Sequence, residues 1–270
     1  MEGLELPRES LVKVENAIVD GIVRVVEASN SSGAVVALSG GIDSSLVATL
    51  AARAVDVFAL LLPDRATTLT EDMRHAEALA DDLGIDYEVI EIGDVVQAVY
   101  NRRPKVGPDE CRLAYANVKP RVRMLLNYFA ANLDGRIVLG TGNKTELLLG
   151  YFTKYGDGGV DTLPIGDLYK TRVRQMARHV GVPKHIIEKA PSAGLWAGQT
   201  DEGEMGATYE EIDRVLYGVF DLGMSLDDVE KAAGVGDDKV RMIMERVRSS
   251  EHKRNMPPVV SLDEALAFPP

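Results

Sequence analysis

The chain has 270 residues, of which 46% are hydrophobic, and a formal net charge of −12 at pH 7. This length and composition predict one large α/β domain with its own buried core. The acidic balance argues against a general nucleic-acid binder, and neither a signal peptide nor a membrane-spanning run is recognisable. A single cysteine, Cys111, excludes an intramolecular disulfide and a CxxC metal or redox pair. We therefore expect a cytoplasmic protein that binds neither nucleic acid nor membranes.

The first half of the chain alternates between helical and strand patterns. Apolar residues at helical spacing predict a first helix over residues 9–29. Strands are predicted over 33–38, 55–63, 86–92 and 135–143, and the helices between them over 44–54, 68–84 and 110–131, the last broken or begun near Pro120. This alternation is typical of a doubly wound, mainly parallel sheet.

The second half is less regular. Residues 145–152 start a further helix, but 150–170 and 190–206 are rich in glycine and polar residues and are predicted to be loops. Long loops inside a compact domain are usually functional. Residues 208–255 predict three helices. We therefore expect one domain, with a sheet core over about 9–190, a helical C-terminal layer over about 208–255 and a peripheral tail over 256–270.

The sequence "LSGGIDSS" (38–45) lies between the first strand and its helix. Backbone N–H groups and the helix dipole converge at such a turn and favour a phosphate, and Ser44 or Ser45 is placed to cap the helix. An ordinary tight turn remains an alternative, because glycine, aspartate and serine are common turn residues. A second glycine-bearing turn, at 140–143, emerges at the same edge of a parallel sheet. The two turns can therefore face one cleft.

The first turn is neither a Walker A loop nor a GxGxxG fingerprint. Its sequence "SGGIDSS" resembles the PP-loop, SGGxDS, of the ATP pyrophosphatases, which split ATP into AMP and pyrophosphate. The stretch "VLGTGNKTELLLGYFTKYGDGGVDTLPIGDLYKTRV" (138–173) is similar to the central part of NAD synthetases, as are "NVKPRVRM" (117–124), "EKAPSAGL" and "EHKR" (251–254). The resemblance covers about residues 10–254, in the family's order, and implies the fold of the adenine nucleotide α-hydrolases.

The resemblance to NAD synthetases implies an activity and a set of roles. The activity is the ATP-dependent amidation of deamido-NAD by ammonia, through an adenylated intermediate, in a homodimer. Asp43 and Lys170 would be catalytic, and Asp43 and Glu146 would hold Mg²⁺. ATP would contact Leu38, Ser39, Gly40, Gly41, Ile42, Asp43, Ser44, Ser45, Thr141, Lys170 and Ser192, the last standing where relatives often carry threonine. Deamido-NAD would contact Arg121, Lys154, Asp161, His252 and Lys253.

The chemistry of these residue types fits the implied roles, although simpler interpretations remain open. Two carboxylates plus phosphate oxygens suit Mg²⁺, and a dianionic dinucleotide needs cations in an acidic protein. Alternatively, Lys154 and Lys170 are solvated surface charges. Glu146 could be the second half of a helix capping box, and His252 could complement a helix dipole. Trp196 and Met205 are predicted to pack within their loop.

Two further expectations concern the nitrogen source and the dimer. Glutamine-using relatives carry an amidase domain with a nucleophilic cysteine, and Cys111 has no such context, so we expect free ammonia or ammonia from a separate glutaminase. Apolar residues on more than one face of the helix predicted at 110–131, beside Arg121, favour a subunit interface there. They are Tyr115, Leu125, Leu126, Tyr128 and Phe129.

Rival functions share the first loop. A GMP synthetase, an argininosuccinate synthetase or a tRNA-thiolating enzyme would also carry it, although the last usually needs catalytic cysteines. A nucleotide-sensing module would bind ATP without turnover, and it would need no second loop rich in glycine and aspartate. Formation of AMP that depends on both deamido-NAD and ammonia distinguishes these functions.

Overall fold

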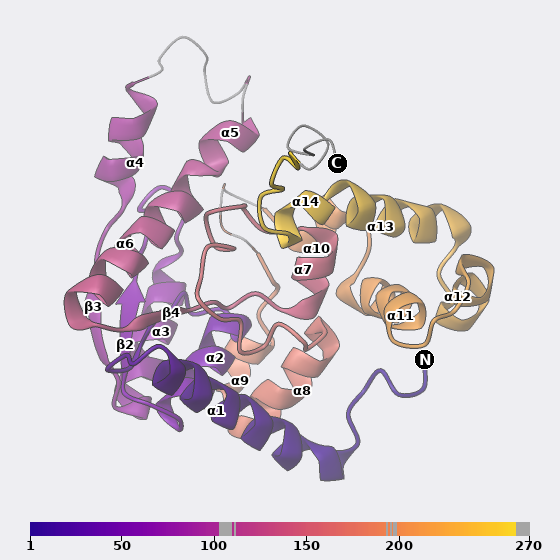
Figure 1. The fold of residues 1–270 in the computed structure, drawn as a ribbon, viewed down its shortest axis with the longest axis horizontal. Coiled ribbons are helices and arrows are strands. Elements are labelled where there is room, and N and C mark those ends of the chain that lie inside the picture. Colours follow the sequence, from indigo (N-terminus) through magenta and orange to yellow (C-terminus); the bar gives the residue numbers. More distant parts are fainter. Residues whose placement is uncertain (103–109, 111, 193, 195, 197–198, 263–270) are drawn as a thin grey trace, which may run out of the picture.

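The computed structural model describes residues 1–102, 110, 112–192, 194, 196 and 199–262; Cys111 lies outside these residues. Within them, one parallel sheet carries four strands in the order β3-β2-β1-β4 (Figure 1). The strands are β1 (Ala34–Ala37), β2 (Val57–Leu61), β3 (Asp86–Val89) and β4 (Ile137–Leu139). They confirm the predicted strands, although each is shorter than its sequence pattern.

The strand order reverses next to β1. Val35 of β1 pairs with Phe58 of β2 on one side and with Val138 of β4 on the other. The chain therefore passes outward from β1 to β2 and β3, and then returns to the opposite side of β1 to form β4. This confirms the doubly wound sheet. In such sheets ligands bind at the carboxyl ends of the strands where the order reverses, which here lies between β1 and β4.

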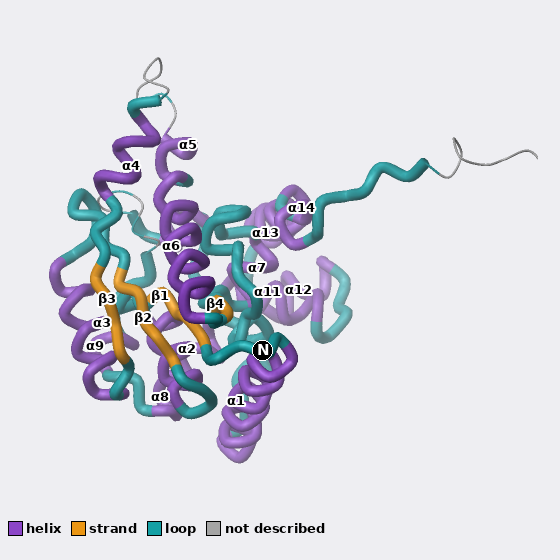
Figure 2. Tube along the Cα trace, turned by 60° about the vertical axis from the view of Figure 1, so that its left-hand side comes forward, coloured by secondary structure: helices purple, strands orange, loops and turns teal. Residues whose placement is uncertain are grey.

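Helices bury both faces of the sheet, as parallel sheets require (Figure 2). Side chains of alternate strand residues, such as Val36 and Val35, belong to two separate apolar clusters. The Val36 cluster includes residues of α1 (Leu11–Ala28), α2 (Ile42–Ala52), α3 (Thr70–Leu83), α8 (Lys170–Val180) and α9 (Lys184–Ile187). The Val35 cluster includes residues of α4 (Gly93–Tyr100) and α6 (Val118–Asp134).

A third apolar cluster forms the C-terminal helical layer. Its helices are α11 (Tyr209–Phe220), α12 (Leu226–Ala233) and α13 (Asp237–Ser249), which pack beside α7 (Lys144–Leu149) at one side of the sheet (Figure 1). A short fourth helix, α14 (Glu251–Arg254), follows the three that were predicted. Beyond it, residues 255–262 are exposed and run outward from the body (Figure 2).

The structure differs from the sequence expectation at several helices. The single helix predicted over 110–131 is divided into α5 (Arg112–Ala116) and α6 by Asn117. Pro120 lies in the first turn of α6, where its missing N–H leaves no bond unmade. The helix α4 was not predicted, and a short helix, α10 (Asp201–Met205), lies within the segment expected to be irregular. Burial of Met205 in the helical layer, which confirms its packing role, anchors α10.

The amino-terminal residues join the two apolar layers. A 3-10 helix, η1 (Arg8–Ser10), precedes α1, and Leu4 packs in the cluster of the C-terminal layer. None of the helices in the described part of the chain is long and apolar enough to cross a bilayer.

Candidate active site

The turns that follow β1 and β4 meet where the strand order reverses. The side-chain amide Nδ2 of Asn143 donates to Asp43 Oδ1 at 2.9 Å. Ser39 and Asp43 from the first turn, and Gly140 and Thr141 from the second, line one cavity of about 640 Å³. The expectation that both turns face a single cleft is therefore confirmed.

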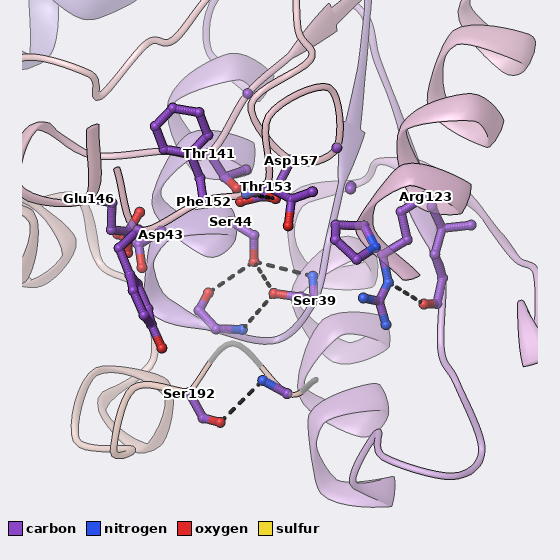
Figure 3. Close-up of a pocket in the computed structure, with 18 of the residues that line it drawn as sticks. Ser39, Asp43, Ser44, Arg123, Thr141, Glu146, Phe152, Thr153, Asp157 and Ser192 are labelled. Carbon is purple, nitrogen blue, oxygen red and sulfur yellow. Dashed lines mark hydrogen bonds between the residues drawn. The ribbon is translucent and has the colours of Figure 1, made fainter. Parts of the chain in front are cut away.

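Two features shape the first turn. Gly40 has a φ of +76°, and a Cβ atom there would lie 2.3 Å from the carbonyl oxygen of Asp72, so only glycine fits. The hydroxyls of Ser39 and Ser44 are 3.0 Å apart, and Ser44 Oγ also donates to the Gly41 carbonyl (Figure 3). These hydrogen bonds within the turn hold it in one conformation.

The predicted serine cap of α2 is wrong. The N-cap is Gly41, which has no capping side chain, and Ser44 lies inside the first turn. The hydroxyl of Ser45 is buried and has no hydrogen-bond partner in the described part of the chain. The first bond within the helix runs from Ser45 N–H to the Gly41 carbonyl. The preceding N–H groups have no partner inside the helix, and this is the arrangement that suits an anionic phosphate.

A buried lysine joins the two predicted metal ligands. Lys170, the first residue of α8, is 1% exposed, so the interpretation as a solvated charge is wrong. Its Nζ donates to Asp43 Oδ2 and lies 3.4 Å from Glu146 Oε1. Figure 3 shows Asp43 and Glu146 side by side. We call Asp43, Glu146 and Lys170 the carboxylate end of the cavity.

Glu146 is both a capping residue and a member of this cluster. Its Oε2 accepts from the Asn143 N–H at 3.3 Å, and Asn143 caps α7 in return. The capping-box interpretation is therefore confirmed for one carboxylate oxygen, while the other oxygen faces Lys170. The helix cap thus fixes the direction in which the carboxylate points.

Burial and charge set the protonation of the carboxylate end. Burial raises the pKa of Glu146, which Lys170 opposes and Asp43 reinforces. Burial alone would lower the pKa of Lys170, but the two neighbouring carboxyl groups raise it above its usual value. Lys170 therefore keeps its proton, and Glu146 takes up a proton more readily than an ordinary glutamate.

The same geometry fits a divalent cation. The described residues contain no group of three or more His, Cys, Asp or Glu side chains arranged to hold a metal by themselves. Asp43 Oδ2 and Glu146 Oε1 nevertheless face one point, because both interact with the same ammonium group. Mg²⁺ is often held by one or two carboxylates, with substrate phosphates and water supplying the other oxygens. The donor set is therefore adequate only together with a phosphate ligand.

Four of the five residues predicted to bind deamido-NAD lie together elsewhere along the cavity. Arg121 Nη2 donates to the Lys154 carbonyl at 3.3 Å, and Lys154 Nζ donates to the His252 carbonyl at 2.5 Å. Lys253 Nζ donates to the carbonyls of Gly150 and Phe152 at 2.6 and 2.8 Å. We call Arg121, Lys154, His252 and Lys253 the cation end. The side chains of Arg121, Lys154 and Lys253 donate to neutral carbonyls, which do not cancel their positive charge; the Asp157 carboxyl group interacts electrostatically with Lys253.

Three predicted site residues do not line the cavity: Gly40, Ser45 and Asp161. Asp161 is exposed, and it accepts from the Tyr128 hydroxyl at 2.9 Å and from the Val138 N–H at 2.8 Å. It thus holds the loop to the edge of β4. All the other predicted ATP and deamido-NAD residues line the cavity. Among them, Ser192 donates its hydroxyl proton to the Gln199 carbonyl at 2.8 Å.

Sequence reasoning missed several lining residues. Arg123 donates from Nε to the Leu62 carbonyl at 3.0 Å and lies across the cavity from Glu146 (Figure 3). Asp157 lies in the glycine-rich stretch predicted to be a loop; its Oδ1 accepts from the Thr153 N–H at 2.9 Å, and desolvation in the cavity raises the pKa of its carboxyl group. Trp196, expected only to pack in its loop, lines the cavity and carries the Arg112 guanidinium 4.3 Å from its ring centre.

Comparison with protein families gives one consistent result. A family model for NAD synthase matches residues 14–257. A relative from Archaeoglobus fulgidus, NH3-dependent NAD+ synthetase, is 49% identical over 257 residues, which cover 94% of this chain and 98% of the relative. A relative of the same name from Methanococcoides burtonii is 46% identical over 257 residues and is covered over 97% of its length.

Solved structures resemble the fold over the same range. NMN synthetase from Francisella tularensis superposes with a TM-score of 0.82 at 34% identity, covering 93% of this chain and 98% of that chain. NH3-dependent NAD synthetase from Campylobacter jejuni, in complex with the nitrate ion, superposes with a TM-score of 0.78 at 31% identity, covering 93% and 99%.

Proposed function

The chain belongs to the NAD synthase family, and we propose that it joins ammonia to deamido-NAD, using ATP and releasing AMP and pyrophosphate. It is therefore a ligase that forms a C–N bond. One observation supports the assignment beyond the family match. The N-terminus of α2 and the carboxylate end lie on one part of the cavity, and the cation end lies on another part of the same cavity. That arrangement suits two anionic substrates held side by side.

The first step is adenylation. A carboxylate oxygen of the nicotinate group attacks the α-phosphorus of ATP, and the bond from that phosphorus to the β-phosphate bridging oxygen breaks. The N–H groups of residues 42–44 bind the departing pyrophosphate, and Lys170 neutralises part of its charge. Because the attacking and departing groups are both anionic, positioning and charge neutralisation supply most of the rate enhancement.

The second step forms the amide. Ammonia attacks the carbonyl carbon of the acyl adenylate, AMP leaves with the bonding electrons, and the nitrogen loses a proton. An acyl adenylate reacts readily with water, so the site must exclude water until ammonia arrives. Described residues of the loops 151–162 and 193–208, among them Lys154, Trp196 and Glu204, line this cavity, and we propose that these residues shield the intermediate.

Asp43 and Glu146 would hold Mg²⁺ together with the ATP phosphates. The ion would supply charge neutralisation on the phosphate oxygens. Both carboxylates are directed to one point by contacts of their own: Asp43 by Asn143, and Glu146 by the helix cap. This fixed direction supports their assignment as ligands, because Mg²⁺ demands near-ideal geometry.

The cation end would bind deamido-NAD. Arg121, Lys154 and Lys253 offer charge to the pyrophosphate of the dinucleotide, and His252 borders them. Asp161 lies outside the cavity of one chain, so any contact with the dinucleotide would require a neighbouring subunit or a rearranged loop.

We also propose a homodimer formed through α6. Leu125, Phe129 and Leu133 are 59%, 62% and 69% exposed and are spaced four residues apart, in one row with Arg121. Large exposed apolar side chains in a row mark an interaction surface. Leu126 is not part of it, because that side chain packs against the sheet cluster. A two-fold contact along the row would bring Arg121 close to the partner.

Two remaining proposals concern the whole protein. The sheet core and the helical layer both border the cavity, through Lys170 and Lys253 for example, which supports a single functional unit. A biosynthetic ligase that uses ATP also fits a cytoplasmic location, where ATP is made available.

The test is a reconstituted assay with purified protein, ATP, Mg²⁺, ammonia and deamido-NAD. We expect AMP and NAD to form together over many turnovers. When either deamido-NAD or ammonia is left out of the assay, multiple-turnover formation of AMP should stop. ATP binding without either dependence would favour a nucleotide sensor and overturn the proposal.

A mononucleotide substrate is the second candidate. It is favoured by the likeness to the NMN synthetase structure, which is 34% identical. Replacing deamido-NAD by nicotinate mononucleotide in the same assay separates the two candidates. We expect a higher kcat/KM for the dinucleotide, because the three cationic side chains of Arg121, Lys154 and Lys253 can engage both of its phosphates. A higher value for the mononucleotide would reverse the assignment.

A further inference from the structure

A buried carboxyl group of the helical layer contacts the two helices that carry Glu146 and Lys170 of the carboxylate end. Asp213 of α11 is fully buried, and α11 packs against both α7 and α8 (Figure 1). Its Oδ1 accepts from the Thr145 hydroxyl at 2.5 Å. Its Oδ2 accepts from both the backbone N–H and the hydroxyl of Thr171, each at 2.7 Å. One side chain thus binds the first turns of two helices.

The Thr145 hydroxyl extends these contacts to the backbone of Lys170. Thr145 Oγ1, which donates to Asp213, also accepts from the backbone N–H of Lys170 at 2.9 Å. The first N–H groups of a helix have no partner within it, and here the N–H groups of Lys170 and Thr171 are satisfied by Thr145 and Asp213. Asp213 is therefore the anionic cap of α8, although it belongs to a different helix.

The capped residues adjoin the reacting groups. Glu146 follows Thr145 directly, and Lys170 precedes Thr171 directly. Lys170 Nζ reaches Asp43 and Glu146 only when the first turns of α7 and α8 keep their relative position. A displacement of 1 Å at a reacting centre can lower a rate about a hundredfold.

We propose that Asp213 is a positioning residue of the catalytic site, which fixes Lys170 and Glu146 through the Thr145 hydroxyl and through the backbone N–H and hydroxyl of Thr171. It touches neither substrate nor reacting atoms, and it does not line the cavity. The inference rests on the proposed adenylation function. It assigns the C-terminal helical layer a role in setting the geometry of the site, in addition to covering the core.

A matched control lies on the same layer. Asp221, directly after α11, accepts from Lys144 Nζ at 3.1 Å and from the Tyr169 hydroxyl at 2.5 Å. Lys144 is the first residue of α7, and Tyr169 directly precedes α8. Both bonds to Asp221 come from side chains, so they satisfy no backbone N–H group of the first turns. Asp221 therefore holds the layers together without capping α8.

The experiment compares Asp213→Asn with Asp221→Asn for kcat, both KM values and the melting temperature. The asparagine at 213 preserves size but cannot accept all three bonds. We expect kcat to fall roughly tenfold to a hundredfold, with the KM for deamido-NAD within about twofold. The Asp221→Asn protein should have a lower melting temperature than the wild type but a kcat within about twofold of the wild-type value. Equal losses of kcat in the two variants, or an Asp213→Asn protein with wild-type kcat, would overturn the proposal.

Thr145 provides a second test that does not depend on changing the carboxyl group. Thr145→Val preserves the shape but removes the hydroxyl, whereas Thr145→Ser keeps it. We expect valine to lower kcat roughly tenfold and serine to restore it to within about threefold of wild type. Valine and serine variants of equal kcat would contradict the relay. Wild-type protein that makes no AMP would instead refute the proposed function, so the two failures are distinguishable.

Discussion

The carboxylate end and the cation end of the cavity use lysine in opposite ways. Lys170 is buried and paired with Asp43 and Glu146. Lys154 and Lys253 donate instead to backbone carbonyls. A carbonyl carries only a partial charge, so these bonds orient the ammonium groups while their full charge still acts on an incoming anion.

This difference shows how a chain with a net charge of −12 can bind two anionic substrates. At the cation end Arg121, Lys154 and Lys253 outnumber the carboxyl group of Asp157 beside them, so the protein supplies positive charge directly. At the carboxylate end Lys170 offsets only part of the charge of Asp43 and Glu146, and the helix N-terminus with a divalent cation would receive the phosphates. The net charge of the whole protein has little effect at the cavity, because physiological salt screens the field of surface charges over a Debye length of about 8 Å.

Asp43→Asn should have the largest effect, because it removes charge from the carboxylate end and leaves the cation end intact. We expect single-turnover pyrophosphate release to fall about a thousandfold, with the KM for deamido-NAD nearly unchanged. Asp56→Asn, at the opposite edge of the sheet beside Arg136, is the control and should retain activity. Pyrophosphate release near the wild-type rate in a folded Asp43→Asn protein would remove Asp43 from the metal site.

Lys170→Met tests the role of the buried ammonium group, because it leaves Asp43 and Glu146 without their shared cation. We expect kcat to fall about a hundredfold, because neutralisation of the leaving group is lost. The same change should strengthen binding of Mn²⁺ without nucleotide at least about tenfold, since the ammonium group no longer repels a divalent cation. Electron paramagnetic resonance of Mn²⁺ measures this directly. Mn²⁺ binding weaker than in the wild type would mean that Lys170 does not compete with the metal.

Lys154→Met addresses the other end. Loss of one charge-assisted contact should raise the KM for deamido-NAD about tenfold and change the KM for ATP by less than about twofold. Steady-state kinetics with each substrate varied in turn gives both values. A larger change for ATP than for deamido-NAD would show that the two ends are assigned the wrong way round.

Phe129→Glu tests whether the cation end is completed by a second subunit. A charge in the exposed row of α6 should shift sedimentation from dimer to monomer and raise the KM for deamido-NAD about threefold to tenfold. Phe220→Glu is the control, because Phe220 is 46% exposed but lies on α11. A wild-type monomer with full activity at micromolar concentration would refute the dimer.

The sequence predicted those parts of the site that depend on local pattern. Alternating strands and helices, with glycine turns after two strands, were enough to place 39–43 and 140–143 at one edge of the sheet. The capping role of Glu146 was also visible, because the capping box is a local motif.

Features set by tertiary packing could not be predicted in this way. Lys170 and Asp43 are 127 positions apart, and no local pattern indicates that this lysine is buried. Asp213 lies in an amphipathic helix beside other acidic residues, so its sequence context is that of a solvated carboxylate. The rotation of α6 about its axis, which exposes Phe129 and packs the half-buried Leu126 against the sheet cluster, depends on how the helix lies on the sheet.

The central claim is that the carboxylate end holds ATP so that the nicotinate carboxylate attacks its α-phosphorus. The direct measurement uses deamido-NAD labelled with ¹⁸O in that carboxylate, with mass analysis of the products. Attack at the α-phosphorus leaves one labelled oxygen in AMP and none in pyrophosphate. Unlabelled AMP, or label in pyrophosphate, would contradict this account.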